Sequence, residues 1–474
     1  MDRAVGAESL AQATALGDGG DRRLQSVELT FADGPGGGRP ARKMAFWRPP
    51  SSAVKFRLGR VREHVSVKRN SGLLDRLVTV GVIAVLVTAP TQYSLEVGDN
   101  FHLSLVDPLV WLVTLVWGIQ RWRSGRLGLI KPPPLVAILF VALAALSLIH
   151  STHLLRSAKD VIQYAEYFIA AYLLFADSVD TVRKLRTVAY VFLALASAVA
   201  LSTLTQYLMP AIPDLMVRGT FGNRNVLGGY VALTLPLMYA LFLFESNRWR
   251  RLWFLAVLVG GLTATLAGGT LIAVLIACAV ISAFRSETVF RSETVFVLYA
   301  TLLTLALAFG WTHLPRDNPG IIQESVAFYH EDGTAAMRYA EWQTALAMTR
   351  DNPLLGVGIG NYQENIGQYY GTLPSIPIKA EADSQNLYLV LASSLGVPAL
   401  LCFLGLLFIS ARRALHSFAH ANERFQKGLA LGLFGSILAF SVNALWAPLI
   451  VRGIGVPLAC VLGLAAALEQ LRKR

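Results

Sequence analysis

The sequence predicts an all-α membrane protein with about twelve transmembrane helices and one large extracytoplasmic loop. Of its 474 residues, 54% are hydrophobic and only 15% are charged, whereas an ordinary soluble protein carries about 25% charged residues. The mean hydropathy is +0.51. Several apolar runs reach the roughly 20 residues that a helix needs to cross a bilayer core. Composition, run length and the placement of basic residues together favour a multi-pass membrane protein.

The chain begins with a polar tail, residues 1–72, that we expect to be cytoplasmic and disordered. Its glycine-rich stretch 34–38 is typical of a flexible linker. Basic residues cluster just before the first apolar run: Lys55, Arg57, Arg60, Arg62, Lys68 and Arg69. Such a cluster is attracted to anionic lipid head groups. The transmembrane domain is expected to occupy the rest of the chain, 73–474.

Twelve apolar runs meet the length criterion for a membrane span. We predict spans over 73–90, 104–120, 133–150, 161–177, 187–209, 225–244, 251–267, 270–284, 294–312, 386–410, 428–447 and 453–470. The run 251–284 is too long for one crossing, and the pair Gly268 and Gly269 is a natural place to divide it. The long run 386–410 is expected to bend near Gly396.

Lysine and arginine concentrate in alternate loops. They are Arg121, Arg123, Arg126, Lys131; Arg183, Lys184, Arg186; Arg248, Arg250, Arg251; Arg285, Arg291; Arg412, Arg413, Arg424, Lys427; and Arg472, Lys473, Arg474. The opposite loops are poor in basic residues, and 91–102 has none. Because basic loops stay in the cytoplasm, both termini are predicted to be cytoplasmic and the long loop 313–385 to lie on the outer face.

The same rule explains the net charge of +12, so we expect no nucleic-acid partner. The three cysteines, Cys278, Cys402 and Cys460, lie inside apolar runs without metal-ligand spacing and are expected to be packing residues. These cysteines are therefore not expected to hold a metal, and we expect no cofactor.

Two of the few outer-face arginines precede the span 225–244, in the stretch Arg-Gly-Thr-Phe-Gly-Asn-Arg-Asn at 218–225. Its glycines allow close backbone approach, and Asn225 is expected to cap the following helix. A helix start offers free N–H groups to an anion. The alternative is a tight turn that holds Arg218 and Arg224 at the lipid head groups.

Two other outer-face arginines are candidates. Arg338 precedes Trp342 by one helical turn, in a helix expected to lie along the membrane. The alternative role of this pair is a structural cation–aromatic contact. Arg452 lies at the outer edge of the last span and is either a ligand contact or an interface anchor.

Three motifs in this order resemble the O-antigen ligase/O-antigen polymerase family of bacterial membrane glycosyltransferases. The first is the stretch 218–225; the second is Arg-x-x-x-Trp at 338–342 followed by Asn-Pro-x-x-Gly-x-Gly-x-Gly-Asn-Tyr at 352–362; the third is Asn-x-Tyr-Leu at 386–389 leading to Gly396. The resemblance covers roughly residues 200–474.

The resemblance implies a metal-independent enzyme of the bacterial inner membrane. Such an enzyme takes a glycan from an undecaprenyl-diphosphate carrier at the outer leaflet and transfers it to a glycan acceptor. The acceptor is a second carrier-linked glycan in a polymerase and the lipid A core in a ligase, while some relatives transfer to protein hydroxyls. A chain-length regulator or polysaccharide export machinery is a further candidate partner.

By motif position, Arg218 and Arg338 correspond to the family's arginines that neutralise the diphosphate. A guanidinium is always charged and binds phosphate oxygens in a forked geometry, which suits a diphosphate leaving group. Substrate contacts are expected from Arg224, Asn225, Trp342, Asn386, Tyr388 and Arg452.

The chain departs from the ligases of this family at Gln385, where they carry a histidine immediately before the motif asparagine. Glutamine cannot accept a proton at neutral pH, so it is not a general base. Three alternatives remain: Asp383 or Glu381 serves as the base, Gln385 only orients the acceptor hydroxyl, or the activity has diverged. The family's arginine after the seventh span is also missing from 265–270.

Because the ligase histidine is absent, we expect a polymerase that makes a surface polysaccharide or exopolysaccharide. A ligase or an O-linked protein glycosyltransferase is the nearer alternative. A secondary transporter is the more distant one, since twelve spans with cytoplasmic termini also suit carriers. Its support is Glu166, the one clear acid in mid-span.

Overall fold

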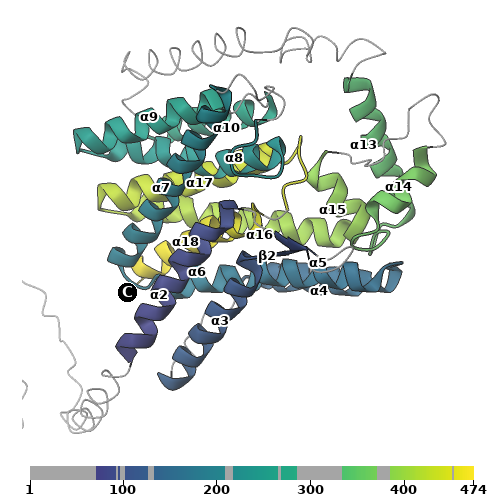
Figure 1. The fold of residues 1–474 in the computed structure, drawn as a ribbon, viewed down its shortest axis with the longest axis horizontal. Coiled ribbons are helices and arrows are strands. Elements are labelled where there is room, and N and C mark those ends of the chain that lie inside the picture. Colours follow the sequence, from purple (N-terminus) through teal and green to yellow (C-terminus); the bar gives the residue numbers. More distant parts are fainter. Residues whose placement is uncertain are drawn as a thin grey trace, which may run out of the picture. The chain divides into compact units, whose positions relative to one another are not determined.

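The structure is a computed structural model, and it describes residues 71–91, 94–96, 102–125, 133–208, 217–264, 268–285, 334–370, 385–450 and 453–473. These residues belong to one compact unit of packed helices (Figure 1). The predicted cytoplasmic tail, up to residue 70, lies outside the described residues. The prediction that it is disordered stays a prediction.

The described elements are nearly all helical. They are α2 Ser71–Thr88, η2 Ala89–Thr91, β1 Ser94–Glu96, β2 His102–Ser104, α3 Val106–Arg123, α4 Leu135–Leu146, η4 Ser147–His150, α5 Leu154–Ala165, η5 Glu166–Ala171, α6 Tyr172–Ser178, α7 Val182–Tyr207, α8 Arg224–Phe244, α9 Arg248–Ala264, α10 Gly268–Arg285, α13 Thr334–Asp351, α14 Tyr362–Tyr370, α15 Leu387–Leu395, α16 Val397–His420, α17 Arg424–Asn443 and α18 Gly455–Arg472.

Each predicted span that lies wholly or mostly among the described residues overlaps a helix, and 294–312 lies outside them. Six described helices are long and apolar enough to cross a membrane: Gly72–Thr91, Val182–Gln206, Arg224–Phe244, Val397–His420, Arg424–Asn443 and Gly455–Arg472. Leu135–His150 and Gly269–Arg285 are shorter apolar helices. The helical, membrane-spanning class is confirmed, while the count of twelve and the extracytoplasmic loop stay predictions.

Among the described residues, the departure from an all-helical fold is a two-stranded antiparallel hairpin, which pairs Ser94 with Ser104 and Glu96 with His102. Strands of three residues are too short to show the period-two alternation by which a sequence predicts a strand. The hairpin lies in the loop between the first two predicted spans.

Helix α8 is the centre of the bundle, and every residue from Val226 to Leu243 is buried. It packs closely on α17, where Gly428, Gly432 and Gly435 face its side chains. A Cβ atom at Gly432 would lie 2.6 Å from Leu237 Cδ1. Small residues let helix backbones approach closely, which is how membrane helices pack in the absence of a hydrophobic driving force.

The run 386–410 divides at Gly396, as predicted, into α15 and α16. Gly396 has φ of +85°, a left-handed conformation that favours glycine. A Cβ atom there would overlap the carbonyl of Leu354, which belongs to the segment between α13 and α14. We call residues 352–361, which fill this elbow, the glycine joint.

The glycine joint is bonded to the elbow through backbone alone. Val357 N donates to Ser393 O at 2.8 Å, and Val397 N donates to Pro353 O at 2.8 Å. Its three glycines, Gly356, Gly358 and Gly360, have φ of +65°, +98° and +79°. The motif glycines therefore build a turn that only residues without a side chain can form at this contact.

The other side of the glycine joint lies on the corner between α4 and α5. Ser157 Oγ donates to Ile359 O at 2.6 Å, and the buried Asn361 donates through Nδ2 to His150 O at 2.9 Å. His150 Nδ1 lies 2.9 Å from Gly356 O and must donate, because a carbonyl oxygen only accepts. The joint thus fixes α13 and α14 to two separate helix pairs.

We predict that Gly396→Ala destabilises the protein by at least about 1–2 kcal/mol, the cost of a left-handed conformation for a residue with a Cβ atom. The added methyl group also meets the Leu354 backbone, which cannot move without opening the joint. Thermal unfolding of the purified chain in detergent measures the loss. Gly118→Ala on α3 is the matched control, since nothing lies within 4 Å of its Cβ position. Equal stability of both variants would contradict the proposed contact.

Candidate functional site

The turn that carries Arg218 is held by Gln206 near the end of α7. Gln206 Oε1 accepts hydrogen bonds from Arg218 N at 3.1 Å and Gly219 N at 2.9 Å, while its Nε2 donates to Gly219 O at 2.7 Å. Gly219 has φ of +62°. The Arg218 side chain is exposed, and its Nη1 donates to Gly222 O at 3.1 Å. The backbone is fixed, and the guanidinium retains donors for a ligand.

The helix that follows is capped by Asn223. Its side chain accepts a hydrogen bond from Val226 N at 2.9 Å, and its backbone is extended, as an N-cap requires. The prediction that Asn225 caps this helix is wrong, because the helix begins at Arg224 and places Asn225 within the first turn. Asn225 is exposed and Arg224 half-buried. Both lie at a helix N-terminus, where N–H groups and the helix dipole favour an anion.

The start of α8 meets the start of α10 and the end of α17. A Cβ atom at Gly228 would overlap Thr270 Oγ1, and Thr270 Oγ1 donates to Asn443 Oδ1 at 3.0 Å. Asn443 is 2% exposed, and its Nδ2 has no hydrogen-bond partner among the described residues. Thr270 ends the stretch 265–270, where the resemblance expects an arginine, and here it is a buried residue that packs three helices together.

The start of α15 is attached to the same end of α17. Leu387 N donates to Ala444 O at 2.9 Å, and Tyr388 OH donates to Ser441 O at 2.6 Å. Asn386 caps α15 by accepting from Tyr388 N at 3.0 Å. The side chains of Asn386 and Tyr388 therefore hold this helix start in place, and contact of either one with substrate stays a prediction.

Gln385, immediately before this cap, has φ of +48°. No other non-glycine residue among those described has a positive φ. A left-handed conformation costs a residue with a side chain about 1–2 kcal/mol. Such strain persists only where the surrounding structure enforces it, and it is concentrated at active sites and ligand clamps. The backbone therefore singles out the same position that the missing histidine singled out in the sequence.

Helix α13 brings Arg338 toward α15. Ala345 and Met348 on α13 form a buried cluster with Leu389 and Val390 on α15, and Figure 1 shows α13, α14 and α15 beside one another. Arg338 lies about two turns before Ala345 on the same helix. Trp342 is half-buried between them. This places the backbone of Arg338 on the helix that packs against the Gln385 segment.

The structure thus joins the Arg218 turn, the starts of α8, α10 and α15, and the end of α17 through a chain of direct contacts. Glu381, Asp383 and Arg452 lie outside the described residues, as does the side chain of Arg338. Gln206 and Asn443 were missed by the sequence analysis. Their only signal is an amide side chain inside an apolar span, which does not say what the amide faces.

Among the described residues, no group of His, Cys, Asp or Glu is placed to hold a metal ion. Metal independence itself stays a prediction.

Residues 255–404 match the family model described as O-antigen ligase. This segment, about a third of the chain, is therefore similar to O-antigen ligases. The matched segment includes α10, α13, the glycine joint and α15, and so includes Arg338 and Gln385. No curated protein matches the chain. The resemblance to the O-antigen ligase/polymerase family is confirmed, and it implies transfer from a lipid-linked glycan donor to a glycan acceptor in a membrane.

If Gln385 is held in a strained conformation by its surroundings, Gln385→Gly should raise the free energy of unfolding by about 1 kcal/mol, because glycine adopts this conformation without a steric penalty. Thermal unfolding in detergent measures the gain. Gln363→Gly on α14 is the control, since Gln363 is exposed within a helix and glycine there is destabilising. A stability loss at both positions would contradict the strain.

Proposed function

We propose that this protein, whose residues 255–404 match the O-antigen ligase model, is a polymerase. It joins undecaprenyl-diphosphate-linked oligosaccharide repeat units into a surface polysaccharide or exopolysaccharide at the outer leaflet of the bacterial inner membrane. The observation that carries the proposal is Arg218, an exposed guanidinium on a fixed turn, beside the first turn of the buried helix α8. Fixed cations and helix N-termini stabilise developing phosphate charge most where water is excluded.

In the proposed reaction, the acceptor hydroxyl attacks the anomeric carbon of the donor glycan. The bond from that carbon to the diphosphate oxygen breaks, and undecaprenyl diphosphate leaves with the electron pair. Arg218 and Arg338 bind the diphosphate, and the N–H groups at the start of α8 add to the positive field. Negative charge grows on the leaving group as the bond breaks, so these groups bind the transition state more tightly than the donor.

The hydroxyl proton requires a separate route, because an amide such as Gln385 cannot accept it. Asp383 or Glu381 serves as the base, or the proton leaves late and needs no strong base. In either case Gln385 orients the acceptor hydroxyl. The buried Nδ2 of Asn443, with no partner among the described residues, is a further donor available to a sugar or phosphate oxygen.

The absence of the ligase histidine supports a polymerase over a ligase. A ligase or an O-linked protein glycosyltransferase that uses the same donor is the alternative. We further propose that the segment 313–385 faces the outside and that both termini are cytoplasmic, which follows from the arginine and lysine distribution among the loops.

Transport has one supporting observation, the acid Glu166. It is 2% exposed and begins a π-helical segment, η5, a distortion that often occurs at functional sites. Uptake into proteoliposomes that is driven by an ion gradient and abolished by Glu166→Gln would favour a transporter instead.

We predict that Arg218→Ala and Arg338→Ala each abolish glycan transfer without lowering the amount of protein in the membrane. Arg218→Lys and Arg338→Lys should retain part of the activity, because lysine keeps the charge but loses the forked geometry. Arg183→Ala is the control, since Arg183 is an exposed arginine at the start of α7. Transfer at the wild-type rate in both alanine variants would exclude the diphosphate clamp.

Substitutions of Gln385 distinguish the effect of its backbone conformation on stability from the effect of its side chain on transfer. Gln385→Gly, expected to be more stable, should transfer more slowly because it cannot orient the acceptor. Gln385→His should raise the rate and make it depend on pH near neutrality, where imidazole titrates. The rate of transfer across pH 5 to 9 measures both, and wild-type profiles in both variants would remove Gln385 from the site.

The polymerase itself is tested with the purified chain and carrier-linked repeat units as sole substrate. Long polymer is the expected product. Glycan that moves only to a supplied lipid A core or protein acceptor would instead show a ligase or a protein glycosyltransferase.

A further inference from the structure

A polar cavity of about 560 Å³ lies between α6, α16 and α18. Charged and polar side chains line it: Tyr172, Arg412, Arg413, His416, Glu469 and Lys473. We call these six residues the basic pocket. None of them belongs to the glycan-transfer site described above, and the inference drawn from them is independent of the proposed polymerase.

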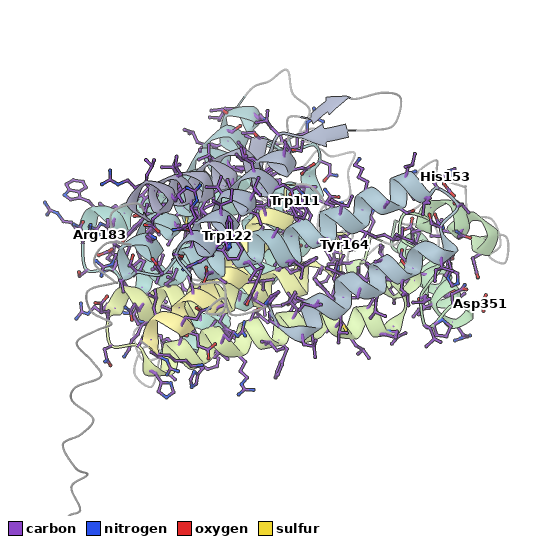
Figure 2. The ribbon with its side chains drawn as sticks, turned by 90° about the horizontal axis from the view of Figure 1, so that it is seen from below. Trp111, Trp122, His153, Tyr164, Arg183 and Asp351 are labelled. Carbon is purple, nitrogen blue, oxygen red and sulfur yellow. The ribbon has the colours of Figure 1, made fainter. Side chains whose placement is uncertain are left out.

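The basic pocket and the candidate site lie at opposite ends of α18. The first residue of α18, Gly455, packs on Tyr167 and follows directly on Ile454, which contacts α8 near its start. The 18 residues of α18 make it about 27 Å long, and Glu469 and Lys473 lie at its far end. Arg186 near the start of α7 bonds Glu423 just beyond the end of α16, so Arg183 lies at this far end also. Figure 2 shows Arg183 opposite His153 and Asp351.

The positive charge of the basic pocket is only partly neutralised by its own carboxylate. Glu469 is bound by Arg413 Nε at 3.3 Å and by Lys473 Nζ at 2.6 Å, so both of its oxygens are engaged. Arg412 has no carboxylate partner among the described residues and is exposed. Three cations against one carboxylate give the pocket a net charge of +2.

Arg413 is held in place by a tyrosine, and Arg472 adds a further cation beside the pocket. Arg413 Nη1 donates to Tyr172 OH at 2.6 Å, which fixes the guanidinium between α16 and α6. Arg472 Nη2 donates to His416 Nδ1 at 2.9 Å, while Arg472 Nε is buried and has no partner among the described residues. A small oxyanion at this place would meet several donors that are already ordered, which lowers the entropy cost of binding it.

An apolar stripe leads along α16 to the pocket. Leu401, Leu404 and Phe408 are exposed at 61%, 39% and 69%. Leu404, Phe408 and Arg412 follow one another at four-residue spacing, so they lie on one face of the helix. A lipid acyl chain can therefore pack along these apolar side chains while its phosphate contacts the arginine at the end of the row.

We propose that the basic pocket binds the phosphate of an anionic phospholipid, whose acyl chain lies along Leu401, Leu404 and Phe408. Arg412 and Lys473 contact the phosphate, and Arg413 and Glu469 hold the pocket in shape. Basic pockets between transmembrane helices on the cytoplasmic side bind such head groups, and the proposed orientation puts this pocket on that side. The lipid joins α16, which follows the Gly396 elbow, to α18.

The test is native mass spectrometry of the full chain in detergent, titrated separately with phosphatidylglycerol, phosphatidylcholine of the same chain length, and inorganic phosphate. Phosphatidylglycerol should bind tightly and the other two weakly. Arg412→Ala should weaken phosphatidylglycerol binding about 5-fold, since one basic contact with an anionic lipid contributes about 1 kcal/mol. Arg412→Ala with Lys473→Ala should weaken it about 25-fold if the two contacts add.

Arg183→Ala controls for non-specific attraction, because it removes an exposed arginine at the same end outside the pocket, and it should leave binding unchanged. Arg412→Lys, which keeps the charge, should retain most of the affinity that Arg412→Ala loses. Retained binding would show that substitution at this position leaves the fold intact. Equal binding of phosphatidylglycerol and phosphatidylcholine, or equal loss in Arg183→Ala, would overturn the site. If inorganic phosphate binds tightly and Arg412→Ala abolishes that binding, the ligand is a free phosphate ion. That result would overturn the assignment to a lipid head group.

Discussion

The contact between the glycine joint and the Gly396 elbow is a meeting of two backbones with no side chain between them. Carbonyl and amide groups of Pro353, Val357, Ser393 and Val397 bond directly, and a Cβ atom at Gly396 would occupy the place of the Leu354 carbonyl. Because backbone polar groups inside a protein must be paired, this contact satisfies the amides that the helix break at Gly396 would otherwise leave without a partner. The placement of α13, and with it Arg338, depends on this contact.

The candidate site is built in the same way, from helix ends rather than from helix faces. Helices α8, α10 and α15 all begin where α17 ends, and a cap or a side-chain amide fixes each neighbouring turn: Gln206, Asn223, Asn386 and Asn443. Four amides are suited to this work because each both donates and accepts without carrying a charge into an apolar bundle. The exposed charge is left to arginine, which stays protonated at any physiological pH.

The two ends of α18 differ in how their charge is arranged. At one end the cations are few and stand beside helix N-termini, an arrangement that favours a transient dianion. At the other end, cations and a carboxylate form a network that is already ordered, with a net positive charge that suits a resident anion. The proposed diphosphate site and the proposed lipid site thus lie at opposite ends of the 18-residue helix α18 and differ in how long they would hold their anion.

The sequence by itself determined the helices, their membrane character, the division near Gly268, the bend at Gly396 and the family, because run length, glycine and motif order are local properties. It also marked Gln385 as the departure from the ligases. Only the tertiary structure decided that Asn223 caps α8 in place of Asn225, that Gln385 is strained, and that the motif glycine Gly356 packs on the Ser394 backbone beside Gly396. These depend on which backbone groups meet after segments far apart in the chain have packed, and spacing along a sequence does not contain that information.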